Sequence, residues 1–240
     1  MNVNATEPQT CRSCGGTGSG NYCSTCGQPY KIRRLSVNGI LHDAMHYFTH
    51  LESGFWYTLK QLLVAPGTMQ RLYIDGARRK YQKPFSMFLI CVTIATLSRY
   101  WIYELLLKYF HTGSAGEASF THHYMELLYA FLIPLLALLT WALFRKSKYN
   151  YAEIAVMQLY SFSFFFIMAT IIALLKLVWH KMDTAYIELP VFIIYNIITF
   201  INFFRESRIW NTVLKSILLT TLIFMTGQVL EDNIINWLKH

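Results

Sequence analysis

Charged residues are scarce in this sequence. Asp, Glu, Lys and Arg make up 14% of its 240 residues, whereas globular proteins carry roughly 25%. Hydrophobic residues reach 54% of the chain. They concentrate after Pro84, in apolar runs that approach the ~20 residues needed to cross a bilayer. This composition argues against an ordinary soluble domain and predicts an all-α fold, a polytopic α-helical membrane bundle.

Sequence features of several enzyme and transporter classes are also missing. We find no glycine-rich phosphate loop and no nucleophile elbow. No internal repeat is evident, which weakens an interpretation as a secondary transporter. Residues 1–10 are polar and lack the apolar stretch of a cleavable signal peptide, so we expect insertion through internal spans.

Cysteine is rare too, but four of the five cysteines form a pattern. Cys11 and Cys14 make one CxxC motif, and Cys23 and Cys26 make a second one after eight intervening residues. A glycine follows each motif, and glycine permits the positive φ that turns backbone N–H groups toward sulfur. Four thiolates so arranged suit one tetrahedral metal ion, most often zinc, with iron as the alternative. We predict a zinc ribbon-like head over residues 1–30.

Two other interpretations of these cysteines are open. Disulfides are one, although a cytoplasmic location disfavours them. A thioredoxin-like redox role is the other, although no βαβ pattern surrounds either motif. The intervening loop, GGTGSGNY, cannot form a hydrophobic core, so a metal would supply most of the folding free energy of the head. We expect the fifth cysteine, Cys91, to be a small core residue.

Residues 31–84 combine two amphipathic helices with a basic segment. Apolar residues recur at helical spacing from Ser36 to about His50, and again from Gly54 to Ala65. Both helices are too short and too polar to cross a membrane. We expect them at the membrane interface or against the cytoplasmic face of the bundle.

A row of histidines lies on the first of these helices. His42, His46 and His50 recur every four residues, with Asp43 beside the first. Histidines at i and i+4 can share a zinc ion, but the glutamate of an HExxH motif is absent. A second metal site or a catalytic site is one interpretation. A polar helix face that happens to be rich in histidine is the one we favour.

Basic residues cluster just before the first long apolar run, in a segment that we call the collar, residues 66–84. Arg78, Arg79, Lys80 and Lys83 lie at its end, and the ten Lys and Arg before Pro84 outnumber the acids there by six. Basic residues beside a span mark the cytoplasmic side. Each also adds roughly 1 kcal/mol of attraction to an anionic lipid surface. We predict that these four side chains bind anionic lipid headgroups, and we expect no nucleic acid partner.

The remaining residues, 85–240, are predicted to form a bundle of four to five spans. The apolar runs cover about 85–103, 125–144, 154–179, 187–204 and 213–230. Five spans with the head inside place 16 of the 21 basic residues on the cytoplasmic side. This bias predicts a membrane protein with a cytoplasmic amino terminus.

Polar residues inside the runs are mostly amides and hydroxyls. Gln158, Asn196 and Asn202 are expected to hydrogen-bond between helices. The first run is the weakest of the five, because Arg99 and Glu104 shorten it. We expect Arg99 to reach the far membrane surface or to pair with Glu104.

The amino-terminal part of the chain resembles a family of bacterial membrane proteins known only as domain of unknown function 3667. Four motifs carry the likeness: CxxCG from Cys11, YCxxCGQ from Tyr22, Pro66-Gly67, and GxRxxYxxP from Gly76. Ala77 stands where the family often has lysine, so this position is not expected to be essential. The resemblance implies zinc-ribbon and membrane character, and it implies no reaction.

Three functions are compatible with these features. The first is a non-enzymatic membrane protein whose zinc head is structural or docks a protein partner, because four cysteines leave no open coordination position. The second is a transporter, channel or lipid-handling protein, which a hydrophilic cavity between the spans would favour. The third is a membrane enzyme that uses the face formed by His42, His46 and His50. We favour the first.

Overall fold

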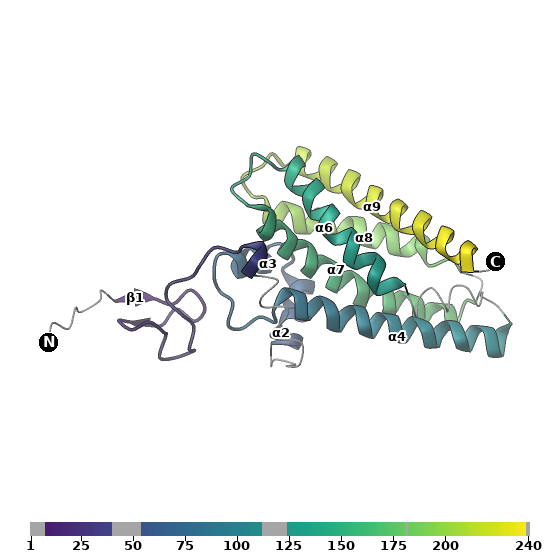
Figure 1. Ribbon diagram of the computed structural model, residues 1–240, viewed down its shortest axis with the longest axis horizontal. Helices are drawn as coiled ribbons and strands as arrows, with labels where there is room; N and C mark the ends of the chain where they lie inside the picture. The colour runs from purple at the N-terminus through teal and green to yellow at the C-terminus, as the bar shows by residue number, and fades with distance from the viewer. Residues whose placement is uncertain (1–7, 40–53, 112–123, 181, 239–240) are drawn as a thin grey trace.

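The computed structural model describes residues 8–39, 54–111, 124–180 and 182–238 (Figure 1). Nearly all of its regular structure is helical, which confirms the predicted all-α class. The elements in chain order are β1 (Gln9–Thr10), β2 (Thr17–Gly18), α2 (Phe55–Val64), α3 (Thr68–Ile74), α4 (Pro84–Phe110), α6 (Met125–Leu143), α7 (Tyr151–Ala173), η1 (Leu174–Leu177), α8 (Ala185–Phe203) and α9 (Ile209–Leu238).

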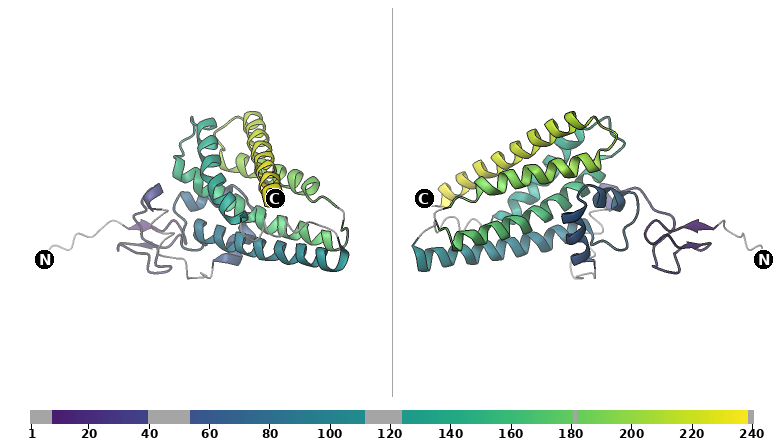
Figure 2. Two further views of the ribbon diagram at one scale, coloured as in Figure 1. Left: turned by 45° about the vertical axis from the view of Figure 1, so that its right-hand side comes forward. Right: turned by 180° about the vertical axis from the view of Figure 1, so that it is seen from behind.

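The long helices form an up-and-down bundle. Successive helices from α4 to α9 run in alternate directions, so the end of α9 lies far from the cysteine head (Figure 1). Two further views show the head beyond one end of the bundle (Figure 2). The head is joined to the rest of the chain by hydrogen bonds. Its described part adds no buried residue to the main hydrophobic core, which begins at Phe55.

In the part of the chain that the structure describes, four helices are long and apolar enough to cross a membrane. They are Pro84–Phe110, Tyr151–Leu177, Ala185–Phe203 and Ile209–Trp237. Within α6, Phe131–Leu143 forms a shorter apolar helix. The sequence analysis identified the first run as the weakest of the five. The structure nevertheless includes α4 among the four, and this helix continues past Arg99 to a total length of 27 residues.

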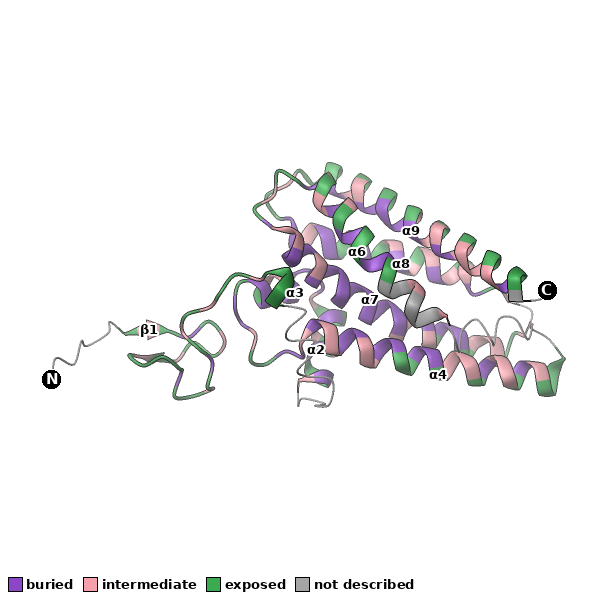
Figure 3. Ribbon diagram, viewed as in Figure 1, coloured by how far each residue is buried: buried purple, intermediate pink, exposed green. Residues whose placement is uncertain are grey.

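The helix α7 lies at the centre of the bundle, and the outer surface of the bundle is apolar. In the most apolar part of Tyr151–Leu177, 67% of the residues are buried, whereas the corresponding part of Ile209–Trp237 has 28% buried (Figure 3). The exposed face of α9 carries Leu214, Leu218, Leu222, Met225 and Val229. A helix that presents such a continuous apolar stripe outward is suited to lipid rather than water. The chain is therefore an integral membrane protein with a multi-pass helical bundle.

The short helices pack under the head end of the bundle. The predicted helix from Gly54 to Ala65 corresponds to α2, whereas α3 lies in the collar, where the sequence analysis predicted no helix. Gly67 separates them with φ +76°, and a Cβ there would overlap the carbonyl oxygen of Thr199 on α8. Glycine is therefore needed at this turn, because the backbone itself approaches α8 closely.

Buried polar contacts hold α3 on α7. The side-chain amide of Gln70 donates to Ser161 Oγ at 3.1 Å, and its oxygen accepts from the backbone N–H of Gly67 at 2.6 Å. Tyr160 Oη, also on α7, donates to the carbonyl oxygen of Gln82 at 2.5 Å. The collar is thus fixed to the centre of the bundle at two points. Of the two predicted helices, the one from Gly54 to Ala65 is described as α2 and packs on the main core through Phe55 and Leu62. Most of the other lies outside the described residues.

Candidate functional site

The two CxxC motifs fold as matching turns. The backbone N–H of Cys11 donates to the carbonyl oxygen of Gly16 at 2.8 Å, and that of Cys23 donates to Gln28 at 2.8 Å. Gly15 and Gly27 have φ of +78° and +71°, as predicted for the glycine after each motif. The strands β1 and β2 pair antiparallel beside the first turn. Local sequence therefore shapes both halves of the head in the same way.

These turns bring the four cysteine side chains together. All four Sγ atoms lie within 4.8 Å of one another. Cys11 Sγ lies 3.6 Å from Cys26 Sγ, and Cys14 Sγ lies 3.5 Å from Cys23 Sγ. A tetrahedral zinc ion with Zn–S bonds of about 2.3 Å places its sulfur atoms about 3.8 Å apart. All four cysteines are free thiols, so their arrangement fits a metal such as zinc rather than two disulfides.

Backbone donors favour the thiolate form at two of these positions. The N–H groups of Cys26 and Thr25 point toward Cys23 and lower the pKa of its thiol to about 6. The N–H groups of Cys14 and Ser13 similarly lower the pKa of Cys11. Because thiolate is the form that binds metal, the lowered pKa makes Cys23 a ready ligand at neutral pH, and the pKa of Cys11 is shifted in the same direction.

The other two thiols are affected in the opposite sense. The N–H of Gln28 favours the thiolate of Cys26, but burial and the neighbouring thiols outweigh it and raise the pKa of Cys26 to about 12. The N–H of Gly16 likewise favours the thiolate of Cys14, yet Cys23 and burial raise its pKa overall. Four adjacent thiolates repel one another, and a bound cation would remove that repulsion.

Gln28 joins this head to the collar. It directly follows the second CxxCG motif, and only 3% of it is exposed. Its side-chain oxygen accepts from the backbone N–H of Arg79 at 3.0 Å, and its amide nitrogen donates to the carbonyl oxygen of Gly76. Arg12 adds a hydrogen bond to the carbonyl oxygen of Asp75 at 2.8 Å. The sequence analysis included this glutamine in the YCxxCGQ motif but assigned it no role.

Gly76 is shaped by the same junction. Its φ is +116°, and a Cβ there would overlap the side chain of Ile32. Gly76 is the first residue of the GxRxxYxxP motif. The head docks at this turn, because the carbonyl oxygen of Gly76 accepts the hydrogen bond from Gln28.

A second connection ties the linker after the head to α7. Arg34 makes two hydrogen bonds with the carboxylate of Glu153, at 2.8 and 2.9 Å. Glu153 also accepts from the backbone N–H of Asn150 in a capping box, and Asn150 donates to the carbonyl oxygen of Leu35 at 3.1 Å. A capping box fixes the first turn of a helix, so the linker is held at the rigid start of α7.

The predicted lipid-binding residues of the collar differ in their surroundings. Arg78 is partly buried, donates to the carbonyl oxygen of Arg33 at 3.1 Å and lies over the ring of Tyr73. Arg79 and Lys80 are exposed, and Lys83 is partly buried at the start of α4. The guanidinium of Arg78 is thus engaged by the protein, which leaves Arg79 and Lys80 as the most accessible cations of the four.

The predicted histidine face lies outside the described residues. His42, Asp43, His46 and His50 all fall within 40–53, so the structure does not bear on the second metal or catalytic site.

The amides inside the spans have mixed roles. Gln158 donates to Thr140 Oγ1 on α6 at 3.0 Å, which confirms a bond between helices. Asn202 donates to the carbonyl oxygen of Pro66 at 3.0 Å. Asn196 instead donates within its own helix, to the carbonyl oxygen of Phe192 at 3.0 Å.

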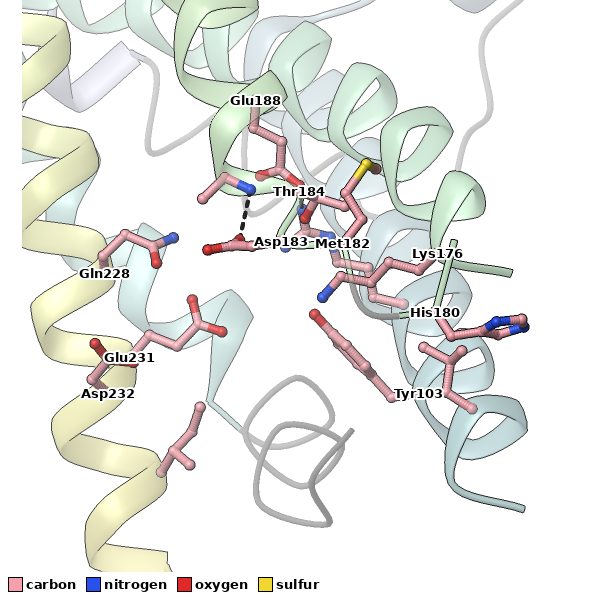
Figure 4. A pocket seen from close by; sticks show the side chains of 14 residues that line it. Tyr103, Lys176, His180, Met182, Asp183, Thr184, Glu188, Gln228, Glu231 and Asp232 are labelled. Carbon is pink, nitrogen blue, oxygen red and sulfur yellow. Dashed lines mark hydrogen bonds and ion pairs between the residues drawn. The ribbon is translucent and has the colours of Figure 1, made fainter. Parts of the chain in front are cut away.

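A polar cavity of about 350 Å³ lies at the end of the bundle farthest from the head. Lys176 and Tyr103 line one side, and Gln228 and Glu231 of α9 line the other (Figure 4). Among the described residues, the ionisable side chains that line it are Arg99, Tyr103, Lys176, His180, Asp183, Glu188, Glu231 and Asp232. The sequence analysis missed this cavity, because its residues come from α4, η1, α8, α9 and the loop before α8, which lie far apart in the chain.

The cavity is bordered by an ion pair that differs from the prediction for Arg99. The guanidinium of Arg99 lies 2.8 Å from the carboxylate of Glu188 on α8, with side-chain exposures of 16% and 6%. The expectation of Glu104 or the membrane surface as its partner omitted Glu188. Pairing with α8 explains why α4 continues past this charge as a regular helix, because a paired charge costs far less to bury.

Comparisons with known proteins match one segment of the chain and give no activity. No curated protein matches the chain, and no solved structure matches it. A family model described as "Protein of unknown function (DUF3667)" matches residues 52–96, which include α2, the whole collar with α3, and the first part of α4. This segment of the chain is therefore similar to that family of proteins of unknown function.

Proposed function

We propose that this protein is a non-enzymatic membrane protein whose four-cysteine head binds a structural zinc ion and holds the collar against the bundle. The observation that carries the proposal is the position of Gln28. It is one residue from the second cysteine turn and hydrogen-bonds to both Gly76 and Arg79. Because metal would set the shape of that turn, it would also set the docking of the head. Iron is the alternative metal.

The presence of four cysteine ligands also indicates what role the metal would have. A site filled by four thiolates offers no open position for substrate or water, which is typical of structural rather than catalytic zinc. The exposed side of the head is then free to dock a protein partner. We place the head in the cytoplasm of a bacterial cell and the bundle in its inner membrane, because most basic residues lie at the head end.

The metal proposal is tested on the purified full-length protein. We expect one zinc or iron ion per chain, lost in the variant Cys11→Ser/Cys14→Ser. Hydrogen exchange at the backbone N–H of Arg79 should then accelerate, because this group no longer donates to the side chain of Gln28. Cys91→Ser is the matched control, since this thiol is buried in α4, away from the head. Less than half an equivalent of metal in the wild type would refute the proposal.

Orientation is tested separately. Helices of alternating direction place the end of α9 opposite the head, so we expect a reporter after His240 to be active outside the cytoplasm. A carboxy-terminal reporter active only in the cytoplasm would contradict both the orientation and the number of crossings.

The collar is proposed to bind anionic lipid through Arg79, Lys80 and Lys83, with Arg78 helping to hold the linker. We expect Lys80 to react more slowly with an amine-modifying reagent in nanodiscs of anionic lipid than in neutral ones. Lys31, exposed on the linker after the head, is the control and should not change. Equal protection of Lys80 in both lipids would contradict the electrostatic attraction.

A second candidate function rests on the polar cavity at the far end. A hydrophilic cavity between spans favours a transporter, channel or lipid-handling protein, because ionisable groups are expensive to keep inside a membrane. In proteoliposomes we would measure flux of small ions and zwitterions for the wild type, Lys176→Met and the control Lys108→Met. Loss of flux in Lys176→Met alone would support this function, and flux no greater than that of empty liposomes would contradict it.

A further inference from the structure

A second charged cavity lies at the head end of the bundle. It has a volume of about 480 Å³ and lies where loop 144–150 meets loop 204–208. Seven basic side chains line it: Arg71, Arg145, Lys146, Lys148, Arg205, Arg208 and Lys215. Among the described residues that line it, the single acidic side chain is Glu206.

Most of this positive charge is not neutralised by the described part of the chain. Glu206 pairs with Lys148 at 3.2 Å, on an exposed part of the surface. Lys215 donates to the carbonyl oxygen of Leu143 at 2.7 Å, and Arg205 donates to Thr68 Oγ1 at 3.3 Å. These last two partners are neutral oxygens. Among the described residues, the cavity therefore keeps a large excess of positive charge.

The positions of these cations need an explanation beyond the usual excess of basic residues in cytoplasmic loops. A preference for basic residues in cytoplasmic loops explains why each loop carries them. It does not explain why α3, two separate loops and the start of α9 direct them into one concavity. Like charges gathered at short range repel one another, so a multivalent anion between them would stabilise the arrangement.

The lining also offers hydrogen-bond donors. Ser147 Oγ is buried and has no hydrogen-bond partner among the residues that the structure describes. Phosphate oxygens accept several hydrogen bonds at once, and arginine side chains can donate to them in pairs. A hydroxyl and several guanidinium groups around one cavity match this chemistry.

The cavity lies beside a lipid-facing surface. Trp210 and Leu214, near the start of α9, are 80% and 64% exposed. Tryptophan is typical of the membrane–water interface, so the cavity lies at the depth of the headgroups. A phosphate could reach it from a lipid in the same leaflet or from the aqueous phase.

We propose that this cavity is a binding site for a phosphate group, with Arg145, Lys146 and Arg208 as its principal cations. The site is separate from the cysteine head and from the exposed cations of the collar. It would tie the loops of α6–α7 and α8–α9 together when the phosphate is bound.

The test uses the full-length protein in neutral detergent with two probes. Phosphatidylglycerol represents the lipid source, and inorganic pyrophosphate represents the soluble source. Binding is measured by native mass spectrometry for the lipid and by calorimetry for pyrophosphate. Arg145→Gln/Lys146→Gln should weaken the tighter of the two probes about thirtyfold, which is roughly the loss of two cations near an anionic group.

The matched control is Lys31→Gln/Lys60→Gln, which removes the same charge from exposed residues outside this cavity. It should change binding less than threefold, and both variants should keep the helical content of the wild type. Tighter binding of phosphatidylglycerol identifies a lipid headgroup as the source, and tighter binding of pyrophosphate identifies a soluble phosphate. Equal weakening in both variants, or no binding of either probe by the wild type, would overturn the proposal.

Discussion

The ion pair between Arg99 and Glu188 allows the sharpest test of how the bundle is held together. It joins α4 to α8 at 2.8 Å, and both side chains are largely buried. Replacing Glu188 with glutamine removes the negative charge but keeps the shape and the hydrogen-bonding ability of the side chain. The guanidinium of Arg99, always charged in proteins, would then be left without its carboxylate.

The expected cost follows from the loss of this buried ion pair. Breaking a buried ion pair by removing one partner costs about 3–5 kcal/mol. We expect the lower end of this range, about 3 kcal/mol, because the pair borders a polar cavity and is not fully desolvated. The double variant Arg99→Met/Glu188→Leu removes both charges and should regain most of the lost stability, since apolar residues of similar volume can replace such a pair.

The assay is unfolding of the purified protein in mixed micelles by titration with sodium dodecyl sulfate, followed by circular dichroism. Each single variant, Arg99→Met and Glu188→Gln, should unfold at a lower detergent fraction than the wild type. The double variant should be more stable than the summed effects of Arg99→Met and of the single variant Glu188→Leu predict. Strictly additive effects of the two replacements would refute the claim that these residues act as a pair.

Three further replacements probe the junction between head and bundle, each monitored by hydrogen exchange and thermal unfolding. Gly76→Ala should destabilise the docking of the head by about 2 kcal/mol, because this residue has a positive φ. The control Gly20→Ala should change the docking free energy little, and equal effects of the two replacements would contradict the backbone explanation. Gln28→Leu should leave the backbone N–H of Arg79 unpaired, at a cost of about 1–3 kcal/mol, and release the head without melting the spans; unchanged exchange in the collar would count against it. Arg34→Met should cost only about 1 kcal/mol because that side chain is largely exposed, and high salt should reduce the difference from the wild type; a salt-independent loss would point to packing rather than to its pairing with Glu153.

Local features of this protein could be predicted from its sequence with good success. The cysteine turns depend on spacing and on two glycines, and both lie within a few residues of the atoms that they position. The helical class and membrane character follow from composition and the lengths of apolar runs, which need no knowledge of tertiary contacts. The helix α2 was predicted for the same reason, because its apolar stripe recurs at helical spacing.

The sequence by itself therefore determined a four-cysteine head, a basic collar and a helical membrane bundle, because spacing, charge and hydropathy are local properties. Only the tertiary structure decided which distant groups meet. It paired Arg99 with Glu188 across 89 positions and placed Gln28 against Gly76 across 48. It also gathered cations from several loops into one cavity. The packing of whole helices determines these partners. The local sequence around each residue does not contain enough information to predict them.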